Sequence, residues 1–192
     1  MSKIKIDKKN IPQHIGIIMD GNRRWAEKRG LSANEGHAAG AKALEKIINH
    51  CLDLGVKTLT VYALSTENWR KRAKKEVKGI FGLIIRYFKE RKEEYKRKGI
   101  KLAVLGEFQA FPRKVARAIT EILKIVKKHE RLKVNLALNY GGRDEILNAV
   151  RKIIKEKISP NKLNEQIFSR FLYTNGESDP DLIIRTGGEI RL

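Results

Sequence analysis

The residues from Asp20 to Arg24 bring together a carboxylate, a glycine, an amide and two guanidinium groups directly after an apolar run at residues 15–19. The run is short and rich in β-branched residues, which predicts a buried strand with Asp20 at its carboxyl end. Gly21 lets the backbone approach a ligand, and the N–H groups of the helix start that follows favour anions. Because magnesium is often held by one or two carboxylates plus phosphates, we expect Mg²⁺ at Asp20. The alternative is a plain strand-to-helix turn capped by Asp20.

Four further side chains suit an anionic or a flat ligand. His37 stands at the start of a predicted helix, where it either contacts a phosphate or serves as a surface or capping residue. Arg185 and Arg191 flank a pair of glycines, and each guanidinium either grips phosphate oxygens as a fork or forms a salt bridge. Trp69, which follows polar residues, either stacks on a substrate or fills the core.

Strand-like runs alternate with helical patterns along the whole chain. This alternation predicts an α/β fold with a mainly parallel central sheet flanked by helices. The predicted strands span residues 15–19, 56–64, 100–105, 132–138 and 182–184. The predicted helices span about residues 35–54, 75–98, 112–128, 143–157 and 161–171.

A polar cluster follows each predicted strand. The clusters are residues 20–22, 65–69, 106–107, 139–143 and 185–189. In a parallel sheet these ends share one edge, where open α/β sheets bind their ligands. A single cluster could be an ordinary turn, but five at one edge predict a binding site.

The longest predicted helix carries an apolar stripe with four-three-four spacing: Val77, Phe81, Ile84 and Phe88. Three more apolar residues, Ile80, Leu83 and Ile85, broaden the stripe beyond what one core contact needs. A plain core helix is the first interpretation, and the wall of a tunnel for an apolar ligand is the second. Gly79 and Gly82 weaken this helix, which local opening or space for a ligand would explain.

Length and composition indicate one folded domain with anionic partners. The 192 residues are 41% hydrophobic and carry a formal charge of +20, which allows nucleic acid, anionic lipid or diphosphates as partners. The single cysteine, Cys51, forbids an internal disulfide and fits a reducing cytoplasm. We find neither a secretory signal nor a membrane span, so we expect a cytoplasmic protein, either soluble or peripheral to the membrane.

Several common sites are missing from the sequence. It contains neither a G-x-x-x-x-G-K-[ST] loop nor a G-x-G-x-x-G turn after a strand, and its four histidines lack zinc-like spacing with the cysteine.

Five blocks of the sequence resemble the cis-prenyltransferases, the group of undecaprenyl and dehydrodolichyl diphosphate synthases. They are Ile-Pro-x-His-Ile-x-Ile-Ile-Met-Asp-Gly-Asn-Arg-Arg-Trp-Ala, Glu-Gly-His, Ser-Thr-Glu-Asn-Trp, Asn-Tyr-Gly-Gly-Arg and Asp-Pro-Asp-Leu-Ile-Ile-Arg-Thr-Gly-Gly-Glu-Ile-Arg-Leu, running from residue 11 to residue 192. The Asn-Arg-Arg-Trp block and residues 172–175 are more similar to archaeal and eukaryotic members than to bacterial ones.

The resemblance implies successive condensation of isopentenyl diphosphate onto an allylic diphosphate, giving a long polyprenyl diphosphate that is the precursor of a glycosyl carrier lipid. It implies Mg²⁺ as cofactor, a homodimer in the full-length form and peripheral membrane association through the product. The implied catalytic residues are Asp20, which is also the metal ligand, and Asn68. The implied substrate-binding residues are Gly21, Asn22, Arg23, Arg24, Trp25, His37, Ser65, Thr66, Glu67, Trp69, Arg70, Arg185 and Arg191.

Three departures from the family pattern stand out. Ala33 replaces the usual arginine four residues before His37, and Arg29 is a candidate substitute. The basic segment 70–72 is about one residue longer than usual, so which of its side chains contacts substrate is open. The chain also stops inside the block that normally continues, so we expect residues 1–192 to form a single domain that lacks the final strand and helix region. Weak or no activity is expected from residues 1–192 alone.

Two other function classes compete with the enzyme. A non-catalytic or impaired subunit of a heteromeric cis-prenyltransferase is the first, but such partners tend to lose the catalytic aspartate and the diphosphate-binding residues, which are present here. A basic nucleic-acid-binding domain is the second, and it is supported by charge alone, so we expect no nucleic acid partner. Product length, the preferred starter and the oligomeric state of residues 1–192 stay open.

Overall fold

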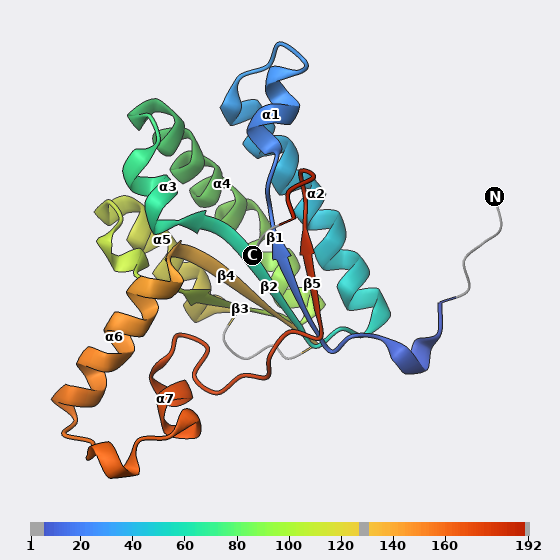
Figure 1. Cartoon of the computed structure of the whole chain (residues 1–192). Helices are drawn as coiled ribbons and strands as arrows, with labels where there is room; N and C mark the ends of the chain where they lie inside the picture. The colour runs from blue at the N-terminus through green and yellow to red at the C-terminus, as the bar shows by residue number, and fades with distance from the viewer. Residues whose placement is uncertain (1–5, 127–130, 191–192) are drawn as a thin grey trace.

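The protein forms one five-stranded sheet in which every neighbouring pair of strands is parallel, in the order β3-β4-β2-β1-β5 (Figure 1). The computed structural model describes residues 6–126 and 131–190. The strands are β1 (His14–Ile18), β2 (Thr58–Ser65), β3 (Ile100–Leu105), β4 (Leu132–Tyr140) and β5 (Leu182–Arg185). The helices are α1 (Asn22–Glu27), α2 (Ala33–Leu54), α3 (Thr66–Lys71), α4 (Lys74–Lys98), α5 (Arg113–Ile125), α6 (Gly142–Lys155) and α7 (Glu165–Phe171).

The predicted fold class is confirmed, and most predicted bounds lie within two residues of the observed ones. The helix predicted over residues 161–171 is wrong in part, because a 3₁₀ turn at Pro160–Lys162 precedes the shorter α7. The end of the helix predicted over residues 112–128 falls outside the described residues. Helix α3 was not predicted, since six residues are too few for a hydrophobic period to be visible.

The long helices begin and end at residues that supply the missing hydrogen bonds. Ser32 and Glu35 form a capping box at the start of α2, and Gly55 ends that helix at a φ of 80°. Gly99 ends α4 in the same left-handed conformation, at a φ of 70°. These stops place β2 and β3 directly after their helices.

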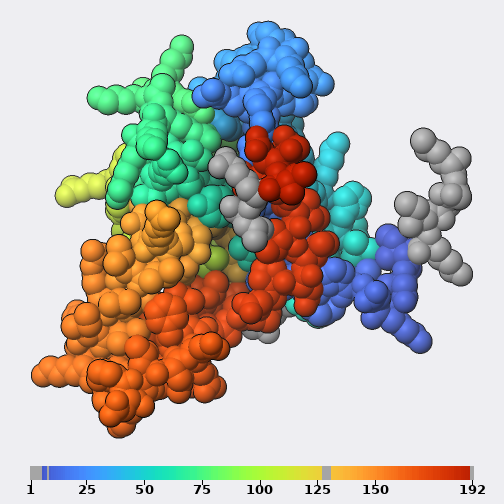
Figure 2. All heavy atoms as spheres, viewed as in Figure 1, coloured from blue at the N-terminus to red at the C-terminus, as the bar shows by residue number. Residues whose placement is uncertain are grey.

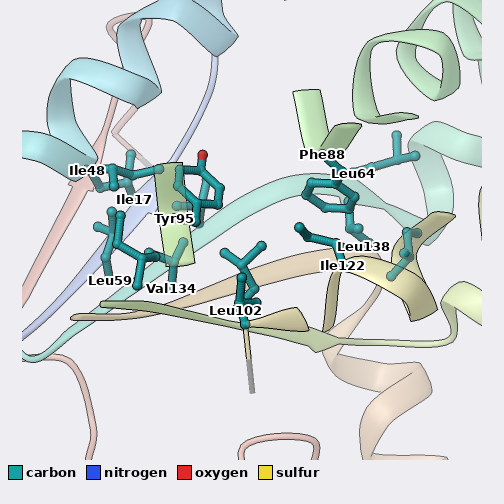
Figure 3. Packing of buried hydrophobic residues seen from close by; sticks show 14 of the residues in the cluster. Ile17, Ile48, Leu59, Leu64, Phe88, Tyr95, Leu102, Ile122, Val134 and Leu138 are labelled. Atoms are coloured by element: carbon teal, nitrogen blue, oxygen red, sulfur yellow. The ribbon is translucent and has the colours of Figure 1, made fainter. Parts of the chain in front are cut away.

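The hydrophobic core lies between one face of the sheet and helices α2, α4 and α5. Its largest fully buried side chains include Leu59, Leu64, Ile100, Ile119 and Leu138. Figure 3 shows side chains of α2 and α4 meeting those of the sheet on this face. Cys51 is buried here, and burial raises the pKa of its thiol, as expected for a structural cysteine.

The opposite face of the sheet is covered more thinly. The segment 172–181 crosses it between α7 and β5 (Figure 1). Several apolar side chains on this side remain exposed, namely Ile146, Leu147, Val150 and Ile154 of α6 and Ile183 of β5. Leu182 and Ile184 of β5 are also exposed, but they pair with Ile15 and Ile17 and point to the core face. Within the described ranges, no helix is long and apolar enough to cross a membrane.

Candidate active site

Asp20 lies just beyond the carboxyl end of β1, in a turn that only glycines can form. Gly21 has a φ of +89°, and a Cβ there would lie 2.9 Å from the Cα of Gly187. Gly187 has a φ of +84°, and its own Cβ would lie 3.0 Å from the backbone of Asp20. The loops after β1 and β5 therefore touch backbone to backbone, and a side chain on either glycine would separate them.

Cationic and backbone donors surround the Asp20 carboxylate. The amide of Gly21 donates to Oδ1 at 2.7 Å, and Arg185 donates to Oδ2 at 2.8 Å. Arg24 lies 3.5 Å from Oδ1 and also donates to the Gly187 carbonyl at 3.1 Å. The Arg185 hydrogen bond, the Gly21 amide and the charge of Arg24 together outweigh partial burial and hold the pKa of Asp20 below its ordinary value. Asp20 is therefore an anion at neutral pH.

Asn22 fixes the start of α1 against α2. A Cβ on Gly40 would lie 2.6–2.8 Å from the Asn22 amide group, and a Cβ on Gly36 would lie 2.2 Å from the Asn22 carbonyl. Both glycines are buried, so the backbone and side chain of Asn22 pack directly on the backbone of α2. The close approach places Asn22 beside Asp20 in the same cavity wall.

A second cluster joins α2 to the start of α4. His37 Nε2 lies 2.9 Å from Glu76 Oε1, and Arg72 lies 3.1 Å from the same oxygen. Arg72 is also 3.2 Å from His37 Nε2. Glu76 thus holds a histidine and an arginine together at the cavity, and both can turn to an entering phosphate.

The segment from Ser65 to Arg72 divides its side chains between packing and the cavity. Ser65 caps α3 by accepting from the Asn68 amide at 3.0 Å, and Thr66 is buried. Trp69 packs edge-on against Phe111 at 5.1 Å, which favours its core interpretation. Within this segment the cavity is lined by Asn68, Lys71 and Arg72.

One cavity of about 650 Å³ connects many of these groups to the core, whereas Arg185 contacts Asp20 without lining the cavity itself. Its charged end is formed by Asp20, Arg23, Arg24, His37, Lys71, Arg72 and Glu76, beside Gly21, Asn22 and Asn68. Its apolar end lies between α2, α4 and the sheet, where Ile48, Phe88, Leu102, Val134 and Leu138 line it. Figure 2 shows α1 and α3 as neighbouring projections at the edge of the molecule where the charged end lies.

The α4 stripe lies partly in the core and partly along the cavity. Val77 and Phe81 are core residues, whereas Ile80, Leu83, Ile84 and Phe88 line the cavity. At Gly79 the space is taken by the Asn34 side chain of α2, 2.2 Å from where a Cβ would lie, so this glycine does not make room for a ligand. Gly82 faces open space.

Several predicted site residues lie apart from the cavity. Arg70 is exposed, while its neighbours Lys71 and Arg72 line the cavity, and the Glu67 side chain forms a salt bridge with Lys71. Trp25 is 41% exposed, and the Arg29 guanidinium stacks over its ring at 4.4 Å, so Arg29 turns toward Trp25. Arg191 lies outside the described residues.

Sequence reasoning missed Glu76, Thr186 and the part played by Arg72. The only available signal for Glu76 was its position four residues after Arg72, a spacing that pairs charges on a helix. Thr186 donates from its hydroxyl to the Asp20 carbonyl at 2.7 Å and accepts from the Asp20 amide at 2.8 Å, a contact across 166 residues that no local pattern reveals.

The donor set at Asp20 fits a magnesium ion that is shared with a substrate. Among the described residues there is no group of three or more His, Cys, Asp or Glu side chains that could hold a metal by itself. A single ionised carboxylate beside cationic groups is the arrangement in which phosphate oxygens complete the magnesium shell.

Comparisons with known proteins agree with this geometry. The family described as "Putative undecaprenyl diphosphate synthase" matches residues 18–192. The chain is 44% identical to an isoprenyl transferase of Clostridium perfringens, over 95% of this chain and 73% of that protein. It is also 44% identical, over 98% of this chain and 73% of the other, to the tritrans,polycis-undecaprenyl-diphosphate synthase (geranylgeranyl-diphosphate specific) of Thermococcus kodakarensis. These bacterial and archaeal relatives are equally similar in sequence.

Solved structures share the fold. Lavandulyl diphosphate synthase from Lavandula x intermedia, in complex with dimethylallyl diphosphate, gives a TM-score of 0.88 at 32% identity and covers 94% of this chain and 79% of its own. A probable undecaprenyl diphosphate synthase from Campylobacter jejuni gives a TM-score of 0.77 at 33% identity, covering 95% and 78%.

Proposed function

Since this chain belongs to the undecaprenyl diphosphate synthase family and is a cis-prenyl chain-elongating transferase, we propose that it adds isopentenyl diphosphate successively to farnesyl or geranylgeranyl diphosphate. The product is a long-chain polyprenyl diphosphate, the precursor of a glycosyl carrier lipid. The observation that carries this proposal is the single cavity, charged at one end and apolar at the other, because an isoprenoid diphosphate has the same two ends.

The allylic diphosphate binds at the charged end in this proposal. Arg24, His37 and Arg72 contact its oxygens, and the amide of Asn22 together with the backbone of Gly21 completes the cradle. Mg²⁺ held by Asp20 would neutralise negative charge on the diphosphate as the carbon–oxygen bond breaks. The cationic residues then stabilise the free diphosphate, which lowers the barrier to ionisation.

Isopentenyl diphosphate binds beside Asp20, and its diphosphate is held by Arg185 and by Arg191. The double bond of isopentenyl diphosphate attacks the allylic carbon, a new carbon–carbon bond forms, and a proton leaves the neighbouring carbon. Asn68 orients reacting groups, because a neutral amide is a poor base, and the departing diphosphate takes the proton. The apolar walls exclude water, which would otherwise capture the allylic cation.

The assembly of the protein is a separate part of the proposal. The chain spans about three quarters of the length of the relatives named above, and we propose that a form of their length is a homodimer. The exposed apolar side chains of α6 support an interface there. The membrane is reached peripherally, through the lipid product.

Incorporation of labelled isopentenyl diphosphate tests the proposed reaction. The wild-type chain, a version extended to the length of its relatives and the Asp20→Ala variant should each be assayed with farnesyl and with geranylgeranyl diphosphate, with and without Mg²⁺. We expect Mg²⁺-dependent chain growth that the Asp20→Ala variant loses. Chain growth by the extended protein that needs neither Mg²⁺ nor Asp20 would contradict the proposal.

A further inference from the structure

The segment 172–181, which we call the strap, is fastened to the face of the sheet opposite the cavity. Glu177 accepts a hydrogen bond from Asn135 at 2.8 Å and forms a salt bridge with Lys133, both on β4. The carbonyl of Ser178 accepts from His14 Nδ1 of β1 at 2.7 Å. The strap therefore passes from β4 to β1 and delivers the chain to the start of β5.

A row of polar side chains on three neighbouring strands receives the strap. His14 of β1 and Asn135 of β4 are buried, Thr60 of β2 is half-buried, and Thr60 stands opposite Asn135 in the strand register. A carbonyl oxygen can only accept, so the His14 proton is on Nδ1, and Nε2 accepts from the Thr60 hydroxyl at 2.8 Å. Asn135 Nδ2 donates to the same hydroxyl oxygen at 3.2 Å. The row is a directed chain of hydrogen bonds rather than a set of isolated polar groups.

The strap ends in a lock formed by Asp181. Asp181 Oδ2 accepts from the amides of Gln13 and His14 at 2.7 and 2.9 Å. The Asp181 amide donates in return to the His14 carbonyl at 2.8 Å. The two amides hold the pKa of Asp181 below its ordinary value. The lock sets the point at which β5 begins to pair with β1.

Burial alone does not define the register of β5. Leu182, Ile183 and Ile184 are 41%, 49% and 42% exposed, with no alternation between a buried and a solvated face. A strand whose two faces are equally covered is weakly specified and prone to slip. β1 is the only strand that β5 pairs with in the described part of the chain, so it has no second neighbour to hold it.

We infer that Asp181 and His14 are positioning residues for Arg185, acting through the register of β5. In the observed register Ile18 faces Arg185, which brings the guanidinium to Asp20 Oδ2 at 2.8 Å. A slip of one residue turns Arg185 to the other face of the sheet, and a slip of two moves it by about 6.6 Å. The lock lies about 13 Å from Arg185, at roughly 3.3 Å for each of four residues.

One premise of the inference comes from the proposed function, namely that Arg185 binds the diphosphate of isopentenyl diphosphate. Among the groups assigned to the allylic diphosphate, Gly21 and Arg24 contact Gly187 in the loop after β5, whereas His37 and Arg72 are held by Glu76. Loss of the lock should therefore weaken the binding of isopentenyl diphosphate more than the binding of the allylic substrate.

Four proteins make the test: wild type, Asp181→Ala, Asp181→Asn and Asp179→Ala. Asp181→Asn keeps an oxygen that accepts both amides. Asp179→Ala removes the same charge from the same strap at an exposed residue that forms no hydrogen bond or ion pair with the described residues. The Kd values of isopentenyl diphosphate and of the unreactive farnesyl thiodiphosphate are measured by calorimetry, and amide exchange is followed in residues 182–186.

We expect Asp181→Ala to raise the Kd of isopentenyl diphosphate about tenfold, as when one charge-assisted contact is misplaced, and to leave the farnesyl analogue within about twofold. Exchange in residues 182–186 should speed up while β2 stays protected, Asp181→Asn should restore most of the affinity, and Asp179→Ala should match wild type. Equal weakening of both ligands, or unchanged exchange in Asp181→Ala, would overturn the inference. Failure of the wild type to bind isopentenyl diphosphate would overturn the substrate assignment instead, and exchange would still decide whether the lock sets the register.

Discussion

The two ends of the cavity are built in opposite ways. At the charged end, Asp20 and Glu76 are each matched to arginines, and the residues stand on turns and helix starts that leave them partly exposed. At the apolar end, side chains such as Phe88 and Leu138 belong to long helices and central strands and are nearly inaccessible to water. The charged end can therefore rearrange its ion pairs around a ligand, whereas the apolar end also holds the fold together.

This difference means that one substitution should not affect both ends equally. Changes at the charged end should alter binding and rate with little loss of stability, because partly exposed ion pairs contribute only about 0–1 kcal/mol. Changes at the apolar end should cost stability first.

The largest effect is expected from Asp20→Asn in the extended protein, which keeps the shape of the side chain and removes its charge. The rate of isopentenyl incorporation should fall about 10³-fold, because both the proposed metal contact and the partner of Arg185 are lost. Single-turnover kinetics would measure this, with Asp53→Asn on α2 as the control. A fall in the free energy of unfolding by several kcal/mol would show instead that Asp20 mainly supports the fold.

At the other end, Leu138→Ala should lower the free energy of unfolding by about 2–5 kcal/mol, since Leu138 is only 2% exposed. The matched change Leu163→Ala, at a residue that is 42% exposed, should cost less than about 0.5 kcal/mol. Urea unfolding measures both values. If the two variants were equally stable, the apolar lining would not be part of the core.

A pair of neighbouring arginines tests the charged end more finely. Arg72→Ala should raise the Kd of farnesyl thiodiphosphate about tenfold, because Arg72 lines the cavity beside His37. Arg70→Ala removes the same charge from an exposed position and should leave the Kd within about twofold. If Arg70→Ala raised the Kd more than Arg72→Ala, Arg70 rather than Arg72 would be the residue that contacts the substrate.

The smallest effect is expected in acid titration. The pKa of Asp20 is lowered in the folded state, so its ionisation stabilises the fold above the unfolded pKa of about 3.9, and this contribution is lost as pH falls through the lower folded value. Arg185→Gln should move the Asp20 pKa up toward its ordinary value, and Arg24→Gln should move it less, since Arg24 is 3.5 Å away rather than 2.8 Å. Carbon-13 shifts of the carboxyl group report both values, and a larger shift in Arg24→Gln would contradict the assignment.

The sheet was predictable from sequence because its strands are parallel and, apart from β5, mostly buried, so each reads as a short apolar run ending in polar residues. That pattern alone placed Asp20 and Arg185 at one edge. The contacts that could not be predicted are made between residues that lie far apart in the sequence. The short helix α3, capped by Ser65, determines which way the basic side chains point, so Arg72 and not Arg70 lines the cavity. His37 contacts Glu76, which is 39 residues later in the chain.

The contacts of the strap could not be predicted from the sequence either. His14 looked like an isolated histidine without a metal-like partner, and its hydrogen bonds go to a carbonyl 164 residues later and to a threonine on another strand. The backbone contact between Gly21 and Gly187 likewise joins two loops that are far apart in the chain. Such contacts follow from topology and not from any local propensity.

The contact between the Gly21 and Gly187 loops has a consequence for biogenesis. A growing polypeptide presents Asp20 early, but the guanidinium that neutralises it arrives 165 residues later. Because domains fold progressively during translation, a nascent molecule can complete most of its core while its reaction centre is still open. Under the proposed function, a nascent chain would become able to ionise a prenyl donor only after β5 has docked on β1.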